Sequence, residues 1–330
     1  MAYPAPARTE ADCLRRKRWE EPDMYSDREG KRICTYSGGF YARENVAKYL
    51  RVFGVRVSIS QWGISIRCGA SGELVGSANL SRSAKTQSNT IQPRRVLMAA
   101  AAYDAFAPYY KAYSKTKEPY LRRIEDIIIA RANGAASLMD AGAGDGSRAL
   151  RITLAASVKR TVLLEPSAGM RAQCAEGSEI WPCEVSEIPG GMERFEIITC
   201  LWNVLGHVQG TQQKLFFLAK LKTLLSPGGM IFLDVSHRYN AAAYGWIKTI
   251  ARMAHDLVLP SENHGDVIVS WKAGRRTIST QGHVFTHGEL QWLFRSAALK
   301  IVERWVIDYE NGAERKVSLT GHLLYQLTAA

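Results

Sequence analysis

The sequence predicts a doubly wound α/β fold, meaning a mostly parallel sheet with helices on both faces, and two observations carry that prediction. Short apolar runs alternate with helical segments from residue 136 onward, which is typical of parallel strands joined by helices. A glycine-rich turn, Gly142 to Gly146, directly follows the first run. The expected parallel strands are Leu138–Asp140, Thr161–Glu165, Phe195–Leu201 and Met230–Val235. Segments 300–307 and 317–327 are expected to end the chain as two further strands, the C-terminal one antiparallel.

The first quarter of the chain predicts a small α+β appendage with its own composition. Its expected parts are a mobile segment over 1–38, an amphipathic helix over 42–53, a hairpin of 55–59 with 64–67, and a polar linker over 77–95. After Arg95 the composition changes from polar residues to an apolar run that is expected to be helical. We therefore expect two domains, an appendage over 1–95 and a main domain over 96–330.

Two helices are expected between that boundary and the sheet. The first runs from Val96 and halts near Pro108, because proline lacks the N–H that a helix interior needs. The second runs from about Pro119, a favourable first-turn residue, to Arg131. A short helix is also expected after Thr286, which can cap it together with Glu289.

Charge and composition restrict the class of protein. The 330 residues carry a net charge of +12, and residues 1–95 hold 17 Lys and Arg against 9 Asp and Glu, a net of +8. This positive excess is equally compatible with binding to nucleic acid, binding to an anionic acceptor, or exposure to water alone. No run of about 18 apolar residues occurs, so we expect a soluble, cytoplasmic protein without a membrane span. The six cysteines form no C-x-x-C pair, and no metal site is expected.

Acidic residues beside the glycine turn indicate the kind of ligand that it binds. Asp140 ends the first strand and Asp145 lies inside the turn, where they disfavour a pyrophosphate and favour an ammonium and a sulfonium. Glu165 ends the second strand, where it can accept hydrogen bonds from ribose hydroxyls. Position 147 is serine, so the dinucleotide pattern G-x-G-x-x-G is incomplete. These residues favour S-adenosylmethionine as the ligand.

Over about residues 100–330 the chain resembles class I S-adenosylmethionine-dependent methyltransferases of the small-molecule type, which implies a Rossmann-like sheet. Residues 138–146 resemble the first motif of that family, 163–171 the second, 195–208 the fourth strand with its turn, and 224–232 the turn into the fifth. Glu184 is similar in position to the family's adenine-binding acid. The cofactor-binding residues that the resemblance and the turn imply are Asp140, Gly142, Gly144, Asp145, Glu165, Pro166, Met170, Glu184, Val185, Leu201 and Asn203.

Candidates for the chemistry lie after the fourth and fifth strands. His207 and His237 are candidate general bases, although each histidine can instead orient a loop. The family commonly covers its site with helices before the first motif, so 96–134 are expected to form a lid. Residues 236–285 are expected to be an acceptor-side insertion. The expected acceptor-binding residues are Tyr103, Tyr109, Tyr113, Arg238 and Tyr239.

Three functions remain open on the sequence. The first is methyl transfer by in-line displacement to a small, secondary-metabolite-like acceptor at oxygen, nitrogen or carbon. The second is RNA or DNA methylation with the basic first quarter as a grip, which the end of the fourth strand, Leu201-Trp202-Asn203-Val204, disfavours because the base-methylating Asn/Asp-Pro-Pro signature is missing. The third is a cofactor-binding scaffold without chemistry. Arg122, Arg123 or Arg238 could hold an anionic acceptor, and a homodimer is left open.

Overall fold

A computed structural model describes residues 98–189 and 193–330 in full, and before residue 98 only the backbone of six strands. Those strands are β1 (Tyr25–Ser26), β2 (Arg32–Ile33), β3 (Val55–Ser60), β4 (Gly63–Cys68), β5 (Glu73–Asn79) and β6 (Val96–Leu97). The chain divides into two compact units, Met1–Glu44 and Asn45–Ala330. The expected helix over 42–53 and the expected mobile segment over 1–38 fall almost wholly outside the described residues.

The expected hairpin before residue 70 is confirmed, and it gains a third strand. β3 pairs antiparallel with β4, and β4 pairs antiparallel with β5. The expected linker over 77–95 therefore starts three residues too early, since β5 continues to Asn79. The rest of that linker lies outside the described residues.

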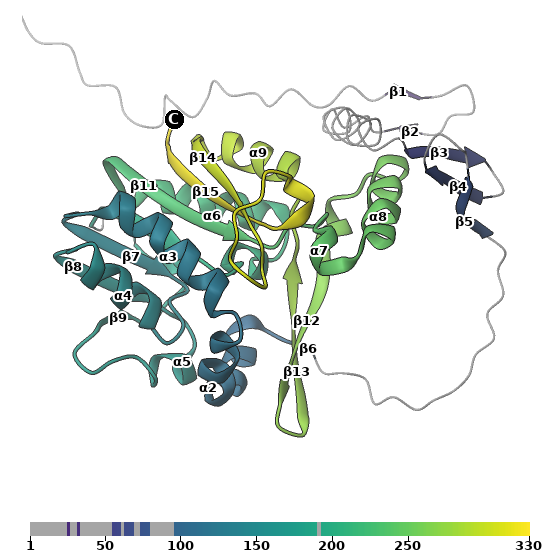
Figure 1. Ribbon diagram of the computed structural model, residues 1–330. Coiled ribbons are helices and arrows are strands. Elements are labelled where there is room, and N and C mark those ends of the chain that lie inside the picture. Colours follow the sequence, from purple (N-terminus) through teal and green to yellow (C-terminus); the bar gives the residue numbers. More distant parts are fainter. Residues whose placement is uncertain are drawn as a thin grey trace, which may run out of the picture. The chain divides into compact units, whose positions relative to one another are not determined.

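A seven-stranded sheet forms the centre of the main domain (Figure 1). Its order is β14-β15-β11-β10-β7-β8-β9. The strands are β7 (Ser137–Ala141), β8 (Arg160–Leu164), β9 (Glu179–Trp181), β10 (Phe195–Cys200), β11 (Leu225–Val235), β14 (Leu299–Ile307) and β15 (His322–Ala329). Only β15 runs against its neighbours in this sheet, between β11 and β14. The predicted mostly parallel sheet with an antiparallel C-terminal strand is confirmed.

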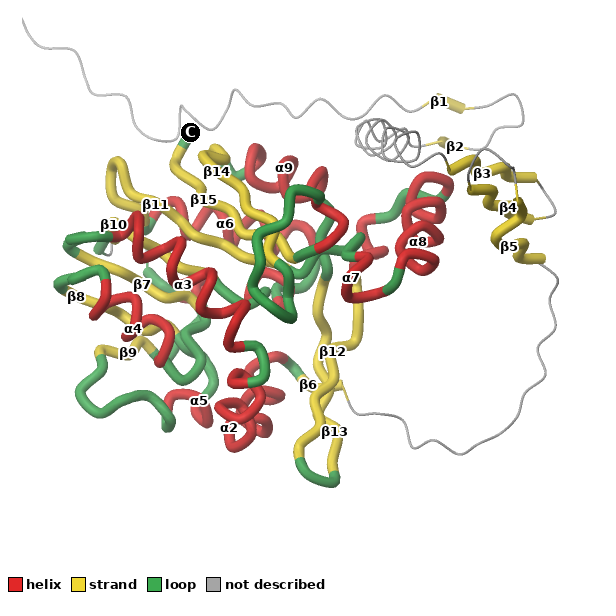
Figure 2. The backbone as a smooth tube through the Cα atoms, viewed as in Figure 1, coloured by secondary structure: helices red, strands yellow, loops and turns green. Residues whose placement is uncertain are grey.

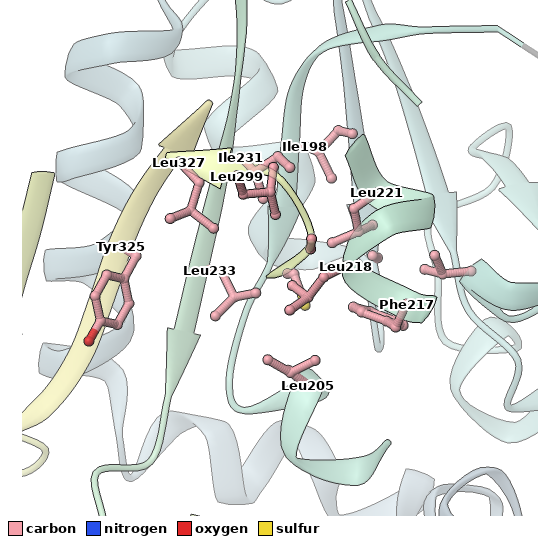
Figure 3. Packing of buried hydrophobic residues seen from close by; sticks show 14 of the residues in the cluster. Ile198, Leu205, Phe217, Leu218, Leu221, Ile231, Leu233, Leu299, Tyr325 and Leu327 are labelled. Atoms are coloured by element: carbon pink, nitrogen blue, oxygen red, sulfur yellow. The ribbon is translucent and has the colours of Figure 1, made fainter. Parts of the chain in front are cut away.

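Helices cover both faces of this sheet, as the doubly wound prediction requires (Figure 2). One face packs against α3 (Glu118–Ala132) and α4 (Ser147–Ala155), and the other against α6 (Thr211–Thr223) and α9 (His287–Ser296). Figure 3 shows the second contact, where Leu218 and Leu221 of α6 meet Ile198 and Leu233 of the sheet. Strand residues alternate between the two cores because successive side chains point to opposite faces.

Several elements differ from the sequence prediction. The first of the two expected helices, α2 (Ala99–Lys115), does not start at Val96, which belongs to the strand β6, and it continues through Pro108 for two more turns. Proline removes one backbone hydrogen bond, but Phe106 and Tyr110 are buried on either side of it, and that packing keeps the helix intact. The sequence pattern did not reveal β9. The last strand starts at His322, after the short helix η6 (Ser318–Thr320), and not at 317.

The segment between β11 and α9 contains two helices and a long hairpin. It consists of α7 (Ala241–Tyr244), α8 (Trp246–Val258), η5 (Glu262–Gly265), β12 (Asp266–Ala273) and β13 (Arg276–His283). β12 and β13 form the hairpin, which turns at Gly274 with a positive φ of 61°. β6 adds to β13 as a parallel third strand, and α2 packs beside the hairpin (Figure 1). Among the described helices, none has the length and apolarity that crossing a membrane requires.

Candidate active site

The glycine turn after β7 needs glycine at two positions for steric reasons. Gly142 and Gly144 have φ values of +73° and +63°, which are unfavourable for residues with a side chain. A Cβ atom on Gly142 would lie 2.6 Å from Val204, and one on Gly144 would lie 2.9 Å from the Tyr110 hydroxyl oxygen. The turn therefore brings bare backbone close to α2 and to the residues that follow β10.

Glu165 joins this turn to the end of the neighbouring strand. Its carboxylate accepts hydrogen bonds from the backbone N–H groups of Gly144 and Ser167, each at 2.8 Å. Burial raises the pKa of Glu165 to about 7, against the lowering effect of those two hydrogen bonds. A bound ribose would compete with these backbone donors for the same two oxygens. Pro166 follows Glu165, and Met170 is fully buried beside the glycine turn.

Two buried groups of opposite charge beside the turn have unpaired atoms among the described residues. Asp140 accepts a 2.7 Å hydrogen bond from Thr199 through Oδ1, while its Oδ2 has no hydrogen-bond partner. Arg148, at the start of α4, is 5% exposed, and its Nη1 has no partner either. Burial raises the pKa of Asp140 to about 6, although the Arg148 charge opposes that shift. Unpaired buried polar atoms are costly, so this pair points to a ligand with both charges.

S-adenosylmethionine, the cofactor that the family resemblance implies, fits those unpaired atoms. Its amino-acid end carries an ammonium and a carboxylate, which match Asp140 Oδ2 and Arg148 Nη1 respectively. The sequence analysis named Asp140 but missed Arg148. The available signal was an arginine in the first turn of the helix after the glycine turn, four residues before the apolar Ile152 and so on the same helix face.

Other expected cofactor residues have local roles in the described structure. Asp145 accepts hydrogen bonds from the Ser147 backbone N–H and hydroxyl, which stabilises the start of α4. Glu184 is exposed and caps the short helix η3 (Val185–Glu187) in a reciprocal pair with Glu187. Val185 and Leu201 are buried.

Asn203 braces the end of β10 against two neighbouring segments. It has a positive φ of 64° and begins the short helix η4 (Val204–His207). Its side-chain oxygen accepts a 3.0 Å bond from the Ser236 backbone, and its amide donates to the His283 carbonyl at 3.2 Å. Asn203 therefore holds the backbone after β10 in place, and its expected contact with the cofactor stays an untested prediction.

His207, at the end of η4, is the candidate base that lies beside α2. Its Nδ1 lies 3.1 Å from the Gln281 carbonyl oxygen, which can only accept, so Nδ1 carries the proton. The bare Nε2 then accepts the hydrogen bond from the Tyr103 hydroxyl at 3.2 Å. Burial lowers the pKa of His207, so its neutral, basic form dominates at neutral pH.

His237 lies in a different environment, away from these residues. It is 2% exposed, its backbone N–H donates to His322, and its ring packs edge-on against Tyr239. The charged groups that influence it are His322, His287 and Arg304 of the C-terminal part. We therefore keep His207 as the candidate base.

Arg238 and Tyr239 are also engaged away from the lid. The Arg238 guanidinium donates two hydrogen bonds of 2.6 Å to the Asp256 carboxylate, and the Tyr239 hydroxyl donates a third of 2.7 Å. Neither side chain is free to bind an acceptor in this arrangement. Their roles as acceptor-binding residues stay untested predictions.

Aromatic side chains of α2 pack against Trp271 of β12 and against Trp202, which follows β10. Phe106 stacks on Trp271 of β12 at a ring-centroid distance of 4.8 Å, and Tyr113 stacks on Trp202 at 5.7 Å. Tyr103 packs against Trp271 at 5.2 Å. Tyr109 is 41% exposed and faces the tip of the β12–β13 hairpin at Gly274.

Asp104 fastens the same helix to the turn after β8. Its Oδ1 accepts hydrogen bonds from the Ser167 hydroxyl at 2.7 Å and from the Gly169 backbone at 2.8 Å. These donors lie at the start of α5 (Ala168–Arg171), whose exposed N–H groups favour an anion. A cavity of about 390 Å³ opens between α2, α3 and α4, with Arg148, Tyr110 and Asp145 in its wall.

Comparisons with known proteins identify the family. A family model described as a methyltransferase domain matches residues 111–304. A search of curated sequences finds no match. Among solved structures, a putative methyltransferase in complex with the Haloferax volcanii Trm112 activator shares 15% identity at a TM-score of 0.51, covering 70% of this chain and 96% of its own.

Two further solved structures are similar at lower scores. The CcbJ methyltransferase from Streptomyces caelestis shares 15% identity at a TM-score of 0.48, covering 63% of this chain and 89% of its own. An S-adenosylmethionine-dependent methyltransferase from Clostridium acetobutylicum shares 12% identity at 0.49, covering 69% and 99%. The family model matches more than half of the chain. The chain therefore belongs to the methyltransferase domain family and is a class I S-adenosylmethionine-dependent methyltransferase.

Proposed function

We propose that this methyltransferase methylates an oxygen or a nitrogen of a small-molecule acceptor, with His207 as the general base. The observation that supports this most is the fixed tautomer of His207, whose Nδ1–H faces the Gln281 carbonyl while Nε2 faces the lid. A neutral imidazole held in this way can take a proton without changing its orientation.

The chain's own groups then have distinct tasks in the displacement. S-adenosylmethionine supplies an electrophilic methyl group on a sulfonium, which leaves as a neutral thioether without acid assistance. The acceptor's O–H or N–H replaces the Tyr103 hydroxyl as donor to His207 Nε2, and that nitrogen takes the proton as the new bond to carbon forms. Burial keeps the pKa of Tyr103 above its usual range, so this phenol stays protonated and serves as a placeholder.

The surroundings of His207 favour an acceptor with an apolar ring. The Tyr103 ring lies edge-on to the His207 ring at 5.5 Å, and Trp271 packs against Tyr103 at 5.2 Å. Such walls are typical of small-molecule pockets, in which few polar groups fix the orientation. A charged nucleic-acid backbone would require cations at this place instead.

We further propose that α2 is a lid and that residues 96–330 form the catalytic domain, with residues 1–95 as an appendage. The Tyr110 hydroxyl lies against Gly144, within the space that a cofactor approaching the turn would use. The helix must therefore move outward for ligands to enter, and its aromatic side chains would close over them afterwards.

Transfer of a labelled methyl group tests the proposed acceptor class. The full-length chain is incubated with labelled S-adenosylmethionine and, separately, with fractionated metabolites and fractionated RNA from the source cells. Label in the metabolite fraction supports the proposal. Label in RNA alone would replace it with nucleic-acid methylation, and binding of the cofactor without any transfer would leave the scaffold function.

A further inference from the structure

Three side chains of the kind that bind transition metals lie together at the end of α8, away from the lid and His207. His255 and Asp256 are adjacent on α8, and His264 comes from η5. Asp256 Oδ1 lies 2.9 Å from His264 Nδ1 and 3.7 Å from His255 Nδ1. All three candidate ligand atoms lie within 4.8 Å of one another, and no other group of this kind occurs in the described part of the chain.

The carboxylate of this group is held in place by residues that leave one oxygen facing the two histidines. Arg238 Nε and the Tyr239 hydroxyl both donate to Oδ2, at 2.6 and 2.7 Å. Oδ1 receives one bond from Arg238 and faces His264 on its other side. Carboxylates that bind metals are commonly oriented by such partners, because a fixed ligand loses less conformational freedom on binding.

His264 provides a second, independent observation. Its Nδ1 atom is buried and lies 2.9 Å from Asp256 Oδ1, in a geometry that forms no hydrogen bond. The ring of His255 lies beside it, with the two centroids 4.6 Å apart. A buried imidazole nitrogen aimed at a carboxylate and a second imidazole is a suitable metal ligand once it is unprotonated.

We propose that His255, Asp256 and His264 bind a divalent transition-metal ion, for which zinc is the probe, with water in the fourth position. Two imidazoles and one carboxylate suit zinc, whereas calcium and magnesium require mostly oxygen ligands. Because the three ligand atoms lie within 4.8 Å of one another, small side-chain movements would bring each of them to about 2.0–2.2 Å from a shared ion. The nearby Arg238 charge opposes the cation, so we expect micromolar affinity.

The position of this site gives the metal a structural task. It would join the C-terminal end of α8 to η5, which runs directly into β12 at Asp266. β12 pairs along its whole length with β13, the strand that carries the Gln281 carbonyl beside His207. A bound ion would therefore stiffen the base of the hairpin on the acceptor side.

Calorimetric titration of the full-length chain with zinc chloride tests this proposal. The chain carries no polyhistidine tag, and the buffer is at pH 7.5. We expect one saturable site per chain and a higher Tm when zinc is present. His255→Ala and His264→Gln should each weaken the binding at least tenfold, while Lys248→Ala, an exposed change on the same helix, should leave it unchanged.

Either of two results would overturn the proposed metal site. Absence of saturable zinc binding by the parent chain contradicts it, as does equal affinity of the parent and both histidine variants. Binding of S-adenosylmethionine by each variant shows that it is folded, and it separates this test from that of the acceptor. Asp256 is left unchanged because its removal would leave the Arg238 charge buried and unpaired.

Discussion

The Tyr103 hydroxyl lies 3.2 Å from Nε2 of His207, and this one contact connects the lid helix to the candidate base. Tyr103 belongs to α2, which precedes the sheet, whereas His207 follows β10, 104 residues later. The only unprotonated nitrogen of the candidate base is thus engaged by α2. We infer that movement of α2, the proposed lid, would expose the candidate base at the same time as it admits an acceptor.

Loss of the Asp104 contact should speed the release of the cofactor. Asp104→Ala removes two hydrogen bonds to a charged acceptor, of which each contributes about 1.5–3 kcal/mol in proteins. We expect the dissociation rate of S-adenosylmethionine to rise at least about tenfold, as measured by stopped-flow fluorescence. Asp126→Ala, an exposed change on α3, is the matched control. An unchanged dissociation rate would contradict the assignment of α2 as a lid.

The pH profile should report a base with a lowered pKa. Burial lowers the pKa of His207 below its ordinary value near 6.5, so the free enzyme loses its base only below that pH. We expect kcat/KM to be constant between pH 7 and 8 and to fall as the pH drops below about 6.5. A descending limb centred above pH 7 would argue against His207.

The cofactor's amino-acid end should depend on Arg148. Arg148→Met should weaken S-adenosylmethionine binding at least about tenfold, because the carboxylate would lose a buried cation. Binding of 5′-methylthioadenosine, which lacks the amino-acid end, should change less than about twofold if the variant is folded. Calorimetry measures both ligands, with Arg295→Met, an exposed arginine of α9, as the control. Equal losses for the two ligands would exclude a specific contact.

Buried histidines should make the fold sensitive to acid. Burial lowers the pKa of His322 to about 4, whereas an unfolded histidine titrates near 6.5. The unfolded chain therefore binds one more proton, and this contribution to stability is present above pH 6.5 and lost as the pH falls toward 4.

Substitution of His322 separates its contribution to the free energy of unfolding from that of carboxyl groups whose pH dependence has the opposite sign. Asp140 and Glu165 have raised pKa values, so protonation in the same range favours their folded form. His322→Gln should reduce the slope of unfolding free energy against pH between 6.5 and 4 by about 1.4 kcal/mol per pH unit relative to the parent chain. Denaturant unfolding at several pH values measures it, and identical slopes would refute the prediction.

Features set by local chemistry were predictable from the sequence. The parallel strands followed from short apolar runs, and the cap of α9 followed from Thr286 with Glu289 three residues later. The glycine turn was also recognisable, because its glycines and acidic residues are adjacent in the sequence. Each of these depends on residues that are neighbours in the chain.

Features set by distant contacts were not predictable in the same way. The continuation of α2 through Pro108 depends on packing against β12 and α5. His207 and His237 both follow strand ends and look equivalent in the sequence, and only their contacts in the fold separate them. The Gln281 carbonyl, which fixes the tautomer of His207, is a backbone atom and leaves no side-chain signal.

The measurement that tests the account most directly is labelled methyl transfer by the parent chain and by His207→Asn. Asparagine keeps a hydrogen-bonding group near Gln281 but cannot act as a base at neutral pH. We predict that the parent chain labels a small-molecule fraction, and that the variant binds S-adenosylmethionine within about twofold of the parent while its kcat falls at least about 100-fold. Equal turnover by the two proteins would contradict the account.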